Sequence, residues 1–67
     1  MINVNYFEIK TGKILLKSVN LPCLPRLKDV ILIRIGGKEI IYRVVDIIFD
    51  HNNSGEFDKI LLALKSN

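Results

Sequence analysis

The stretch of this chain with the most chemistry-bearing side chains is the run DHNNSGEFD at residues 50–58. Its oxygen donors match the first nine positions of a calcium-binding EF-hand loop. The twelfth position, where such loops place a bidentate Glu, is Leu61, and no apolar helical pattern leads into Asp50. Asn, Ser and Gly are also the usual residues of a loop between strands. We therefore expect a polar connecting loop that holds no metal ion or other cofactor.

Two other side chains have types that could act in catalysis, His51 and Cys23. His51 has carboxylates near it in the sequence, but no Ser or Cys nucleophile is placed beside it, and one polar loop excludes little water. Cys23 lies between Pro22 and Pro25 in an apolar segment, where a cysteine is usually an inert small hydrophobic group. A single Cys and a single His cannot build a Cys/His zinc cluster or an internal disulfide within one chain. The sequence therefore predicts that the protein is not an enzyme.

These side chains must be positioned by the apolar stretch at residues 30–49, in which half of the residues are Val or Ile. Such β-branched side chains are stiff and suit a pleated strand better than a helix. Gly36 and Gly37 supply the positive φ that a two-residue hairpin turn requires. The predicted hairpin pairs Ile35 with Lys38, Arg34 with Glu39, Ile33 with Ile40, Leu32 with Ile41 and Ile31 with Tyr42.

This register predicts a core face and a solvent face for the hairpin. The core face would hold Ile31, Ile33, Ile40, Tyr42 and Val44, and the solvent face would hold Arg34, Glu39, Arg43, Leu32 and Ile41. After Val44 the alternation of apolar and polar residues changes phase. We therefore expect a bulge or bend near residues 44–45, which is how small barrels turn corners.

The remaining strands follow from similar patterns. The predicted strands are residues 2–9, 13–19, 29–35, 38–49 and 57–65, arranged as two hairpins and a last strand in a small five-stranded all-β barrel. The last segment also fits a helix, because Phe57, Ile60 and Leu64 fall at helical spacing. The alternation of Ile60, Leu62 and Leu64, and the fifth strand that a small barrel requires, favour a strand there.

Length and composition indicate one small domain over residues 1–67 with more apolar side chains than it can bury. Apolar residues make up 49% of the chain, and a protein of this size buries only about 60% of its unfolded surface. Residues 1–10 lack a basic leader, and the apolar runs are too short to span a bilayer, so we expect a cytoplasmic protein without a membrane partner. The net charge of +3 permits nucleic-acid contact without requiring it.

The segment PRLKDV at residues 25–30, with Gly37 and the Tyr42-x-Val44 strand, is similar to a pattern in short bacterial and bacteriophage proteins. The similarity covers less than half of the chain. Those proteins look like five-stranded SH3-like barrels, so the resemblance implies that fold and a phage-like setting, without an assigned activity. Lys28 stands where the pattern usually has Gly.

The connection at residues 20–26 carries more leucine than a solvent loop usually does. These side chains could plug one open end of a barrel, or they could form an apolar lip that binds another protein. Because the chain cannot bury all its apolar side chains, we expect non-catalytic protein binding. The candidate partner-binding residues are Leu21, Leu24, Leu27, Leu32, Ile41, Arg34 and Arg43.

Two kinds of partner fit this prediction. The first is a second copy of the chain, which would form a homodimer, and the second is a host protein bound by a phage-encoded inhibitor or adaptor. The alternative function is binding of single-stranded nucleic acid, because small barrels can combine aromatic platforms with a basic groove.

Overall fold

The computed structural model describes residues 1–66, and the strands in this part of the chain confirm the predicted all-β class. The elements are β1 (Ile2–Glu8), β2 (Ile14–Leu21), β3 (Val30–Ile35), β4 (Lys38–His51) and β5 (Phe57–Ser66). No helix occurs among the described residues, so residues 57–65 form a strand as predicted. Within the same residues, nothing is helical, long and apolar enough to cross a membrane.

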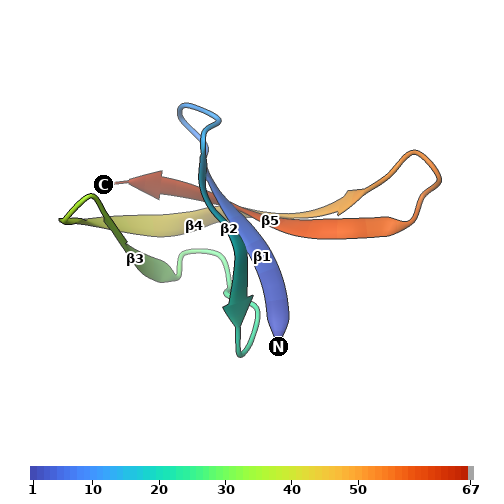
Figure 1. The fold of residues 1–67 in the computed structure, drawn as a ribbon, viewed down its shortest axis with the longest axis horizontal. Helices are drawn as coiled ribbons and strands as arrows, with labels where there is room; N and C mark the ends of the chain where they lie inside the picture. The colour runs from blue at the N-terminus through green and yellow to red at the C-terminus, as the bar shows by residue number, and fades with distance from the viewer. Residues whose placement is uncertain (67) are drawn as a thin grey trace.

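The strands form one curled sheet in the order β2-β1-β5-β4-β3. Strands β1 and β5 are parallel, and the other neighbouring pairs are antiparallel. The sheet curls into a half-barrel, and the β1–β2 hairpin runs across the β4–β5 ribbon (Figure 1). Strands β2 and β3 are the two ends of the order, so each has a sheet neighbour on one side only.

The hairpin of β3 and β4 has the predicted register. Leu32 pairs with Ile41 and Arg34 pairs with Glu39, as the two-residue turn requires. Gly36 has a φ of 56° and Gly37 a φ of 78°, which is the conformation of a type I′ turn. The structure therefore confirms the prediction made from the two glycines and the β-branched residues around them.

Strand β4 bends at Val45, where a register shift separates the pairs Val44–Leu64 and Asp46–Ala63. The extra residue restores Ile47 to the core side of the sheet, and Ile47 packs against the core. This is the bulge predicted near residues 44–45. Beyond it, β4 and β5 continue as a two-stranded ribbon that projects away from the other strands (Figure 1).

Strand β5 lies in the middle of the sheet, between β1 and β4. Leu62, Ala63 and Leu64 are consecutive, and all three are completely buried. A central strand covered on both faces reads as a continuous apolar run rather than as an alternation. This explains why the segment fitted both a helix and a strand in the sequence.

The core occupies the concave side of the sheet. Its buried members are Val4, Tyr6, Ile33, Tyr42, Val44, Leu62 and Leu64. Leu21 at the end of β2 and Leu24 in the connection to β3 are partly buried and pack against this cluster. These two side chains lie as the plug prediction requires, whereas Cys23 and Leu27 of the same segment are exposed.

Candidate functional site

The outer face of the β3–β4 hairpin carries a group of exposed aliphatic side chains. Val30 is 54% exposed, Leu32 is 45% exposed and Ile41 is 49% exposed. Leu32 and Ile41 face each other across the strand pair, and Val30 precedes Leu32 by two residues on the same face. We call Val30, Leu32 and Ile41 the outer patch. Leu32 and Ile41 were predicted on this face. Val30 was missed, although residues two apart on a strand share a face and Val30 precedes Leu32 by two.

Charged side chains border the outer patch. The Nε of Arg34 donates a hydrogen bond to Oε2 of Glu39 at 2.9 Å, and this ion pair is largely exposed. Arg43 pairs with Val30 in the ladder, and its Nη1 donates to the backbone carbonyl of Lys28 at 3.3 Å. An exposed ion pair contributes under about 1 kcal/mol to stability. These bonds therefore matter more for where the charges lie around the outer patch than for the stability of the fold.

The backbone of β3 adds a polar component beside the outer patch. Residue pairs in an antiparallel ladder alternate between hydrogen-bonded and non-hydrogen-bonded. The Val44 N–H donates to the Asp29 carbonyl at 3.0 Å, which sets the phase of this alternation. The β3 residues in non-hydrogen-bonded pairs are therefore Val30, Leu32 and Arg34. Their backbone N–H and C=O groups point away from β4. Because β3 is the end strand of the sheet, these groups form a free edge.

The step into β3 is a turn followed by a bulge. The Asp29 N–H donates to the Arg26 carbonyl at 3.1 Å, and the Lys28 N–H donates to the Val44 carbonyl at 2.8 Å. Lys28 has a φ of 75°, the left-handed region that favours glycine in this kind of bulge. The side chain of Asp29 accepts a further bond from the Arg26 N–H at 2.9 Å. These bonds hold the start of the free edge in place.

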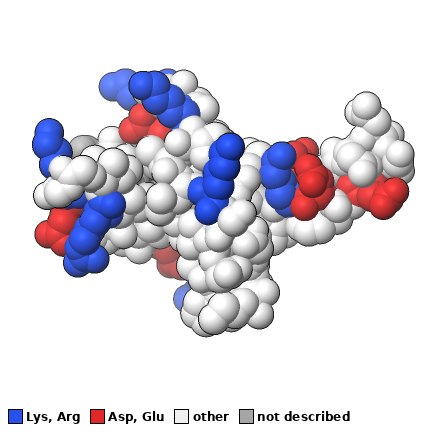
Figure 2. All heavy atoms as spheres, viewed as in Figure 1, with Lys and Arg blue, Asp and Glu red and all other residues white. Residues whose placement is uncertain are grey.

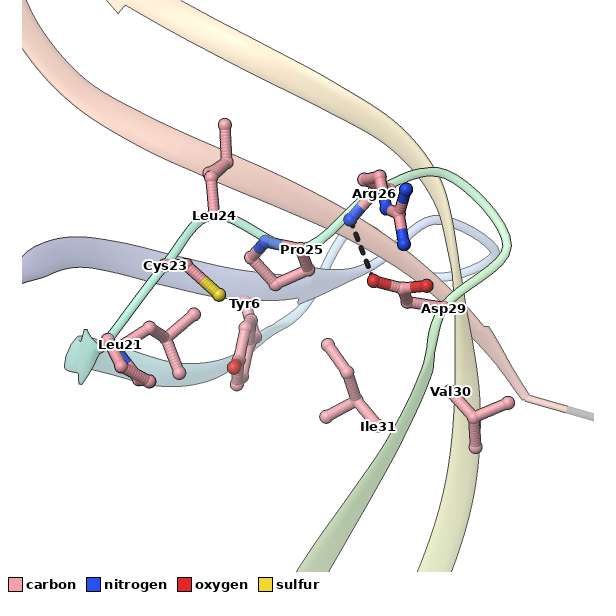
Figure 3. A pocket seen from close by; sticks show the side chains of 10 residues that line it. Tyr6, Leu21, Cys23, Leu24, Pro25, Arg26, Asp29, Val30 and Ile31 are labelled. Atoms are coloured by element: carbon pink, nitrogen blue, oxygen red, sulfur yellow. Dashed lines mark hydrogen bonds between the residues drawn. The ribbon is translucent and has the colours of Figure 1, made fainter.

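A groove of about 600 Å³ lies between residues 21–26, which include Pro22 and Pro25, and the start of β3. Figure 3 shows Leu21, Cys23 and Tyr6 at one end of this groove and the Arg26–Asp29 bond at the other. The structure thus divides the predicted partner-binding residues into groups. Leu32, Ile41, Arg34 and Arg43 lie together on the hairpin, Leu21 and Leu24 pack against the core, and Leu27 is exposed on the loop.

The loop at residues 52–56 uses its polar side chains to hold its own shape. Oδ1 of Asn52 accepts hydrogen bonds from the N–H groups of Ser54 and Glu56, at 2.9 and 3.0 Å. Nδ1 of His51 lies 3.0 Å from the Phe49 carbonyl. Over residues 1–66, no group of three or more His, Cys, Asp or Glu side chains is arranged to hold a metal ion.

Two of the aromatic rings, Tyr6 and Tyr42, are buried, Phe7 is partly buried, and Phe49 and Phe57 are exposed. Burial raises the pKa of Tyr6, and burial together with the nearby carboxylate of Glu8 raises the pKa of Tyr42, so both hydroxyls stay neutral. Phe49 and Phe57 are more than half exposed on the projecting ribbon, where Phe57 also meets the His51 ring edge-on at 5.9 Å. The most exposed rings are therefore on the ribbon.

The ribbon is acidic, whereas the rest of the chain is basic. Residues 46–59 contain four carboxylates and one lysine, a net charge of −3, and the other residues carry +6. Figure 2 shows acidic side chains on the projecting ribbon and most of the Lys and Arg side chains over the rest of the visible face. The one lysine beside the exposed rings, Lys59, lies within ion-pair distance of Asp50 and Asp58, and the other Lys and Arg residues lie outside residues 46–59.

Comparisons of this chain with protein-family models, with curated proteins and with solved structures found no match.

Proposed function

We propose that this chain is a non-catalytic protein-binding module that uses the outer patch and the free edge of β3. The observation that carries the proposal is the juxtaposition of three half-exposed aliphatic side chains with an unpaired strand edge. Burying such side chains against a partner contributes on the order of 1 kcal/mol each, and the edge adds directional hydrogen bonds. The SH3-like class and the phage-like setting, as an inhibitor or adaptor of a host protein, belong to the same proposal.

Binding of single-stranded nucleic acid is the rival function, and the charge distribution argues against it. Nucleic-acid binding needs cations and stacking rings in one groove. Phe49 and Phe57 lie on a ribbon of net charge −3, which repels phosphates. Tyr6 and Tyr42 are buried and cannot stack on a base. Protein binding therefore agrees better with where the exposed rings and charges lie.

The test compares two substitutions at equally exposed isoleucines. Ile41 is 49% exposed within the outer patch, and Ile14 is 47% exposed on β2, the opposite end strand of the sheet. We expect immobilised wild-type protein and Ile14→Glu to retain the same proteins from an extract of the native host, this chain itself included. We expect Ile41→Glu to lose at least one of them by tenfold or more in quantitative mass spectrometry, because a buried carboxylate is costly.

Circular dichroism establishes that both variants are folded before the comparison. Equal retention by wild type and Ile41→Glu would contradict the proposal. So would a salt-sensitive mobility shift of single-stranded oligonucleotides by the wild type, which would favour the nucleic-acid function.

A further inference from the structure

We infer that the partner of this surface is a second copy of the chain, joined through antiparallel pairing of β3 with β3, with Leu32 opposite Leu32 of the second copy. This inference rests on the proposed function, because it identifies the protein that the outer patch and the free edge bind. The two sheet edges, the two faces of β3 and the positions of the charges all support this pairing.

The two edges of the sheet differ in how well they are protected against pairing. Strand β2 has two register shifts against β1, and Ser18 within it has a φ of 55°. Bulges of this kind, together with an edge lysine such as Lys17, block the addition of another strand. Strand β3 pairs with β4 without a register shift over all six of its residues and contains no proline. The β3 edge is therefore the one open to another strand.

Strand β3 also has apolar side chains on both faces. Ile31, Ile33 and Ile35 lie on the core side, and Ile35 at the end of the strand is still 40% exposed. Val30 and Leu32 lie on the outer side. An added strand would therefore gain apolar contacts above and below the new ladder, in addition to the hydrogen bonds. A second β3 has the same apolar residues to offer.

The direction of the backbone groups limits the possible registers. Val30, Leu32 and Arg34 each direct one donor and one acceptor outward. In a two-fold antiparallel pair these residues must face one another. Placing Leu32 opposite Leu32 of the second copy, and Val30 opposite Arg34 of the second copy, uses all of these groups. Either neighbouring register leaves some of them unpaired.

The charges select the same register. If the pairing shifts so that Leu32 faces Arg34 of the second copy, the two Arg34 side chains become diagonal neighbours, about 7–8 Å apart. A shift in the other direction places Arg34 opposite Lys28 of the second copy. In the Leu32-centred register the two Arg34 residues are four positions apart along the strands, about 13 Å. Each guanidinium then keeps Glu39 of its own chain as its partner.

The resulting outer face has a continuous apolar row. Ile41 lies beside Leu32 within each copy, because the two residues pair across β3 and β4. Joining the copies at Leu32 brings the two outer patches together over four neighbouring strands. On the core side, Ile33 of one copy faces Ile31 of the other. The dimer therefore shields the flank of the β3 side chains that faces the sheet edge and joins the two outer patches into one larger apolar surface.

Cysteine cross-linking tests the register. In a background with Cys23→Ser, Leu32→Cys would place two sulfur-bearing residues with Cα atoms about 5.5 Å apart, within the range of a disulfide. Val30→Cys alone and Arg34→Cys alone would place them more than about 13 Å apart. We expect Leu32→Cys to form a covalent dimer at least tenfold faster than either control, and a mixture of the two controls to cross-link with each other. Equal rates for all three single variants would overturn the inference.

Sedimentation equilibrium tests the dimer itself. Leu32→Pro removes an outward N–H that makes no bond to β4, so the hairpin can keep its ladder while the edge loses its central donor. We expect its dimer dissociation constant to be at least tenfold higher than those of wild type and the matched control Leu32→Val. If Leu32→Pro fails to fold, the cross-linking rates decide the question.

The failure of this inference differs from the failure of the proposed function. A wild-type chain that stays monomeric at millimolar concentration would overturn the dimer. The proposed function would stand if Ile41→Glu still lost a host protein that Ile14→Glu retains.

Discussion

Two buried tyrosines determine how the core responds to high pH. Tyr6 and Tyr42 are only 4% and 3% exposed, on neighbouring parts of the same core. Burial raises the pKa of both phenols, and the carboxylate of Glu8 adds to the effect at Tyr42. An ionised phenol would have to sit in an apolar interior, and at Tyr42 also near the negative charge of Glu8. At the scale of single residues, these rings therefore act in packing as neutral groups.

The consequence is a loss of stability in alkaline solution. Below the ordinary tyrosine pKa of about 10, both states keep their protons and these groups add no pH dependence. Above about pH 10 the unfolded chain releases protons that the folded chain still holds, so the free energy of unfolding falls as pH rises. We expect the free energy of unfolding, measured by urea denaturation, to fall less between about pH 9.5 and 11 in the Tyr6→Phe/Tyr42→Phe double variant than in the wild type. The lysines titrate in both proteins and cancel in the comparison, so identical slopes would contradict this assignment.

At the scale of elements, the entry into β3 contains a residue that is poorly suited to its backbone. Lys28 has a φ of 75°, which costs a side-chain-bearing residue about 1–2 kcal/mol. Its exposed side chain makes no ion pair among the described residues. The bonds that matter here, to Val44 and from Arg43, use its backbone atoms. A glycine would keep those bonds and remove the strain.

We therefore expect Lys28→Gly to raise the free energy of unfolding by about 0.5–1 kcal/mol, after the entropic cost of glycine is subtracted. Lys38→Gly is the matched control, because Lys38 is an exposed lysine at the start of β4 without a positive φ. There the same substitution should lower stability by about 0.5–1 kcal/mol. Urea denaturation measures both changes. A decrease of similar size in both variants would show that the left-handed conformation at Lys28 carries no strain.

The elements differ in how well sequence predicts them. The β3–β4 hairpin was predictable because adjacent glycines specify its turn and one-residue slips would bury Arg34 or Glu39. The bulge at Val45 was predictable because the alternation of apolar and polar residues changes phase after Val44. The bulge at Ser18 was not predictable from the sequence. It is accompanied by a long-range hydrogen bond from the Ser18 N–H to Oδ1 of Asn5 at 2.9 Å. A hydrogen bond between residues on different strands leaves no local pattern in a single sequence.

At the scale of the whole molecule, the order of strands places the first strand beside the last. Strand β1 pairs in parallel with β5, and Tyr6 lies beside Leu62. Nothing local in either strand specifies this pairing, because it joins segments at opposite ends of the sequence. The same arrangement leaves β2 and β3 as the end strands. The exposed residues of the candidate site were therefore predictable from the hairpin alone, whereas the free edge beside them was not.

The exposed edge and patch also determine how stability should depend on concentration. A single domain of this size can bury only part of its apolar surface, and association adds stability by mass action. For a native dimer that unfolds to separate chains, we expect the thermal midpoint to rise by about 3–6 °C for each tenfold increase in protein concentration. Leu32→Pro, folded as a monomer, should show a constant midpoint, and Leu32→Val should behave like wild type. Scanning calorimetry over a hundredfold range of concentration measures the difference. A constant midpoint in the wild type would mean that the outer patch does not bind a second copy under these conditions, and its aliphatic side chains would then have to be covered by a different protein.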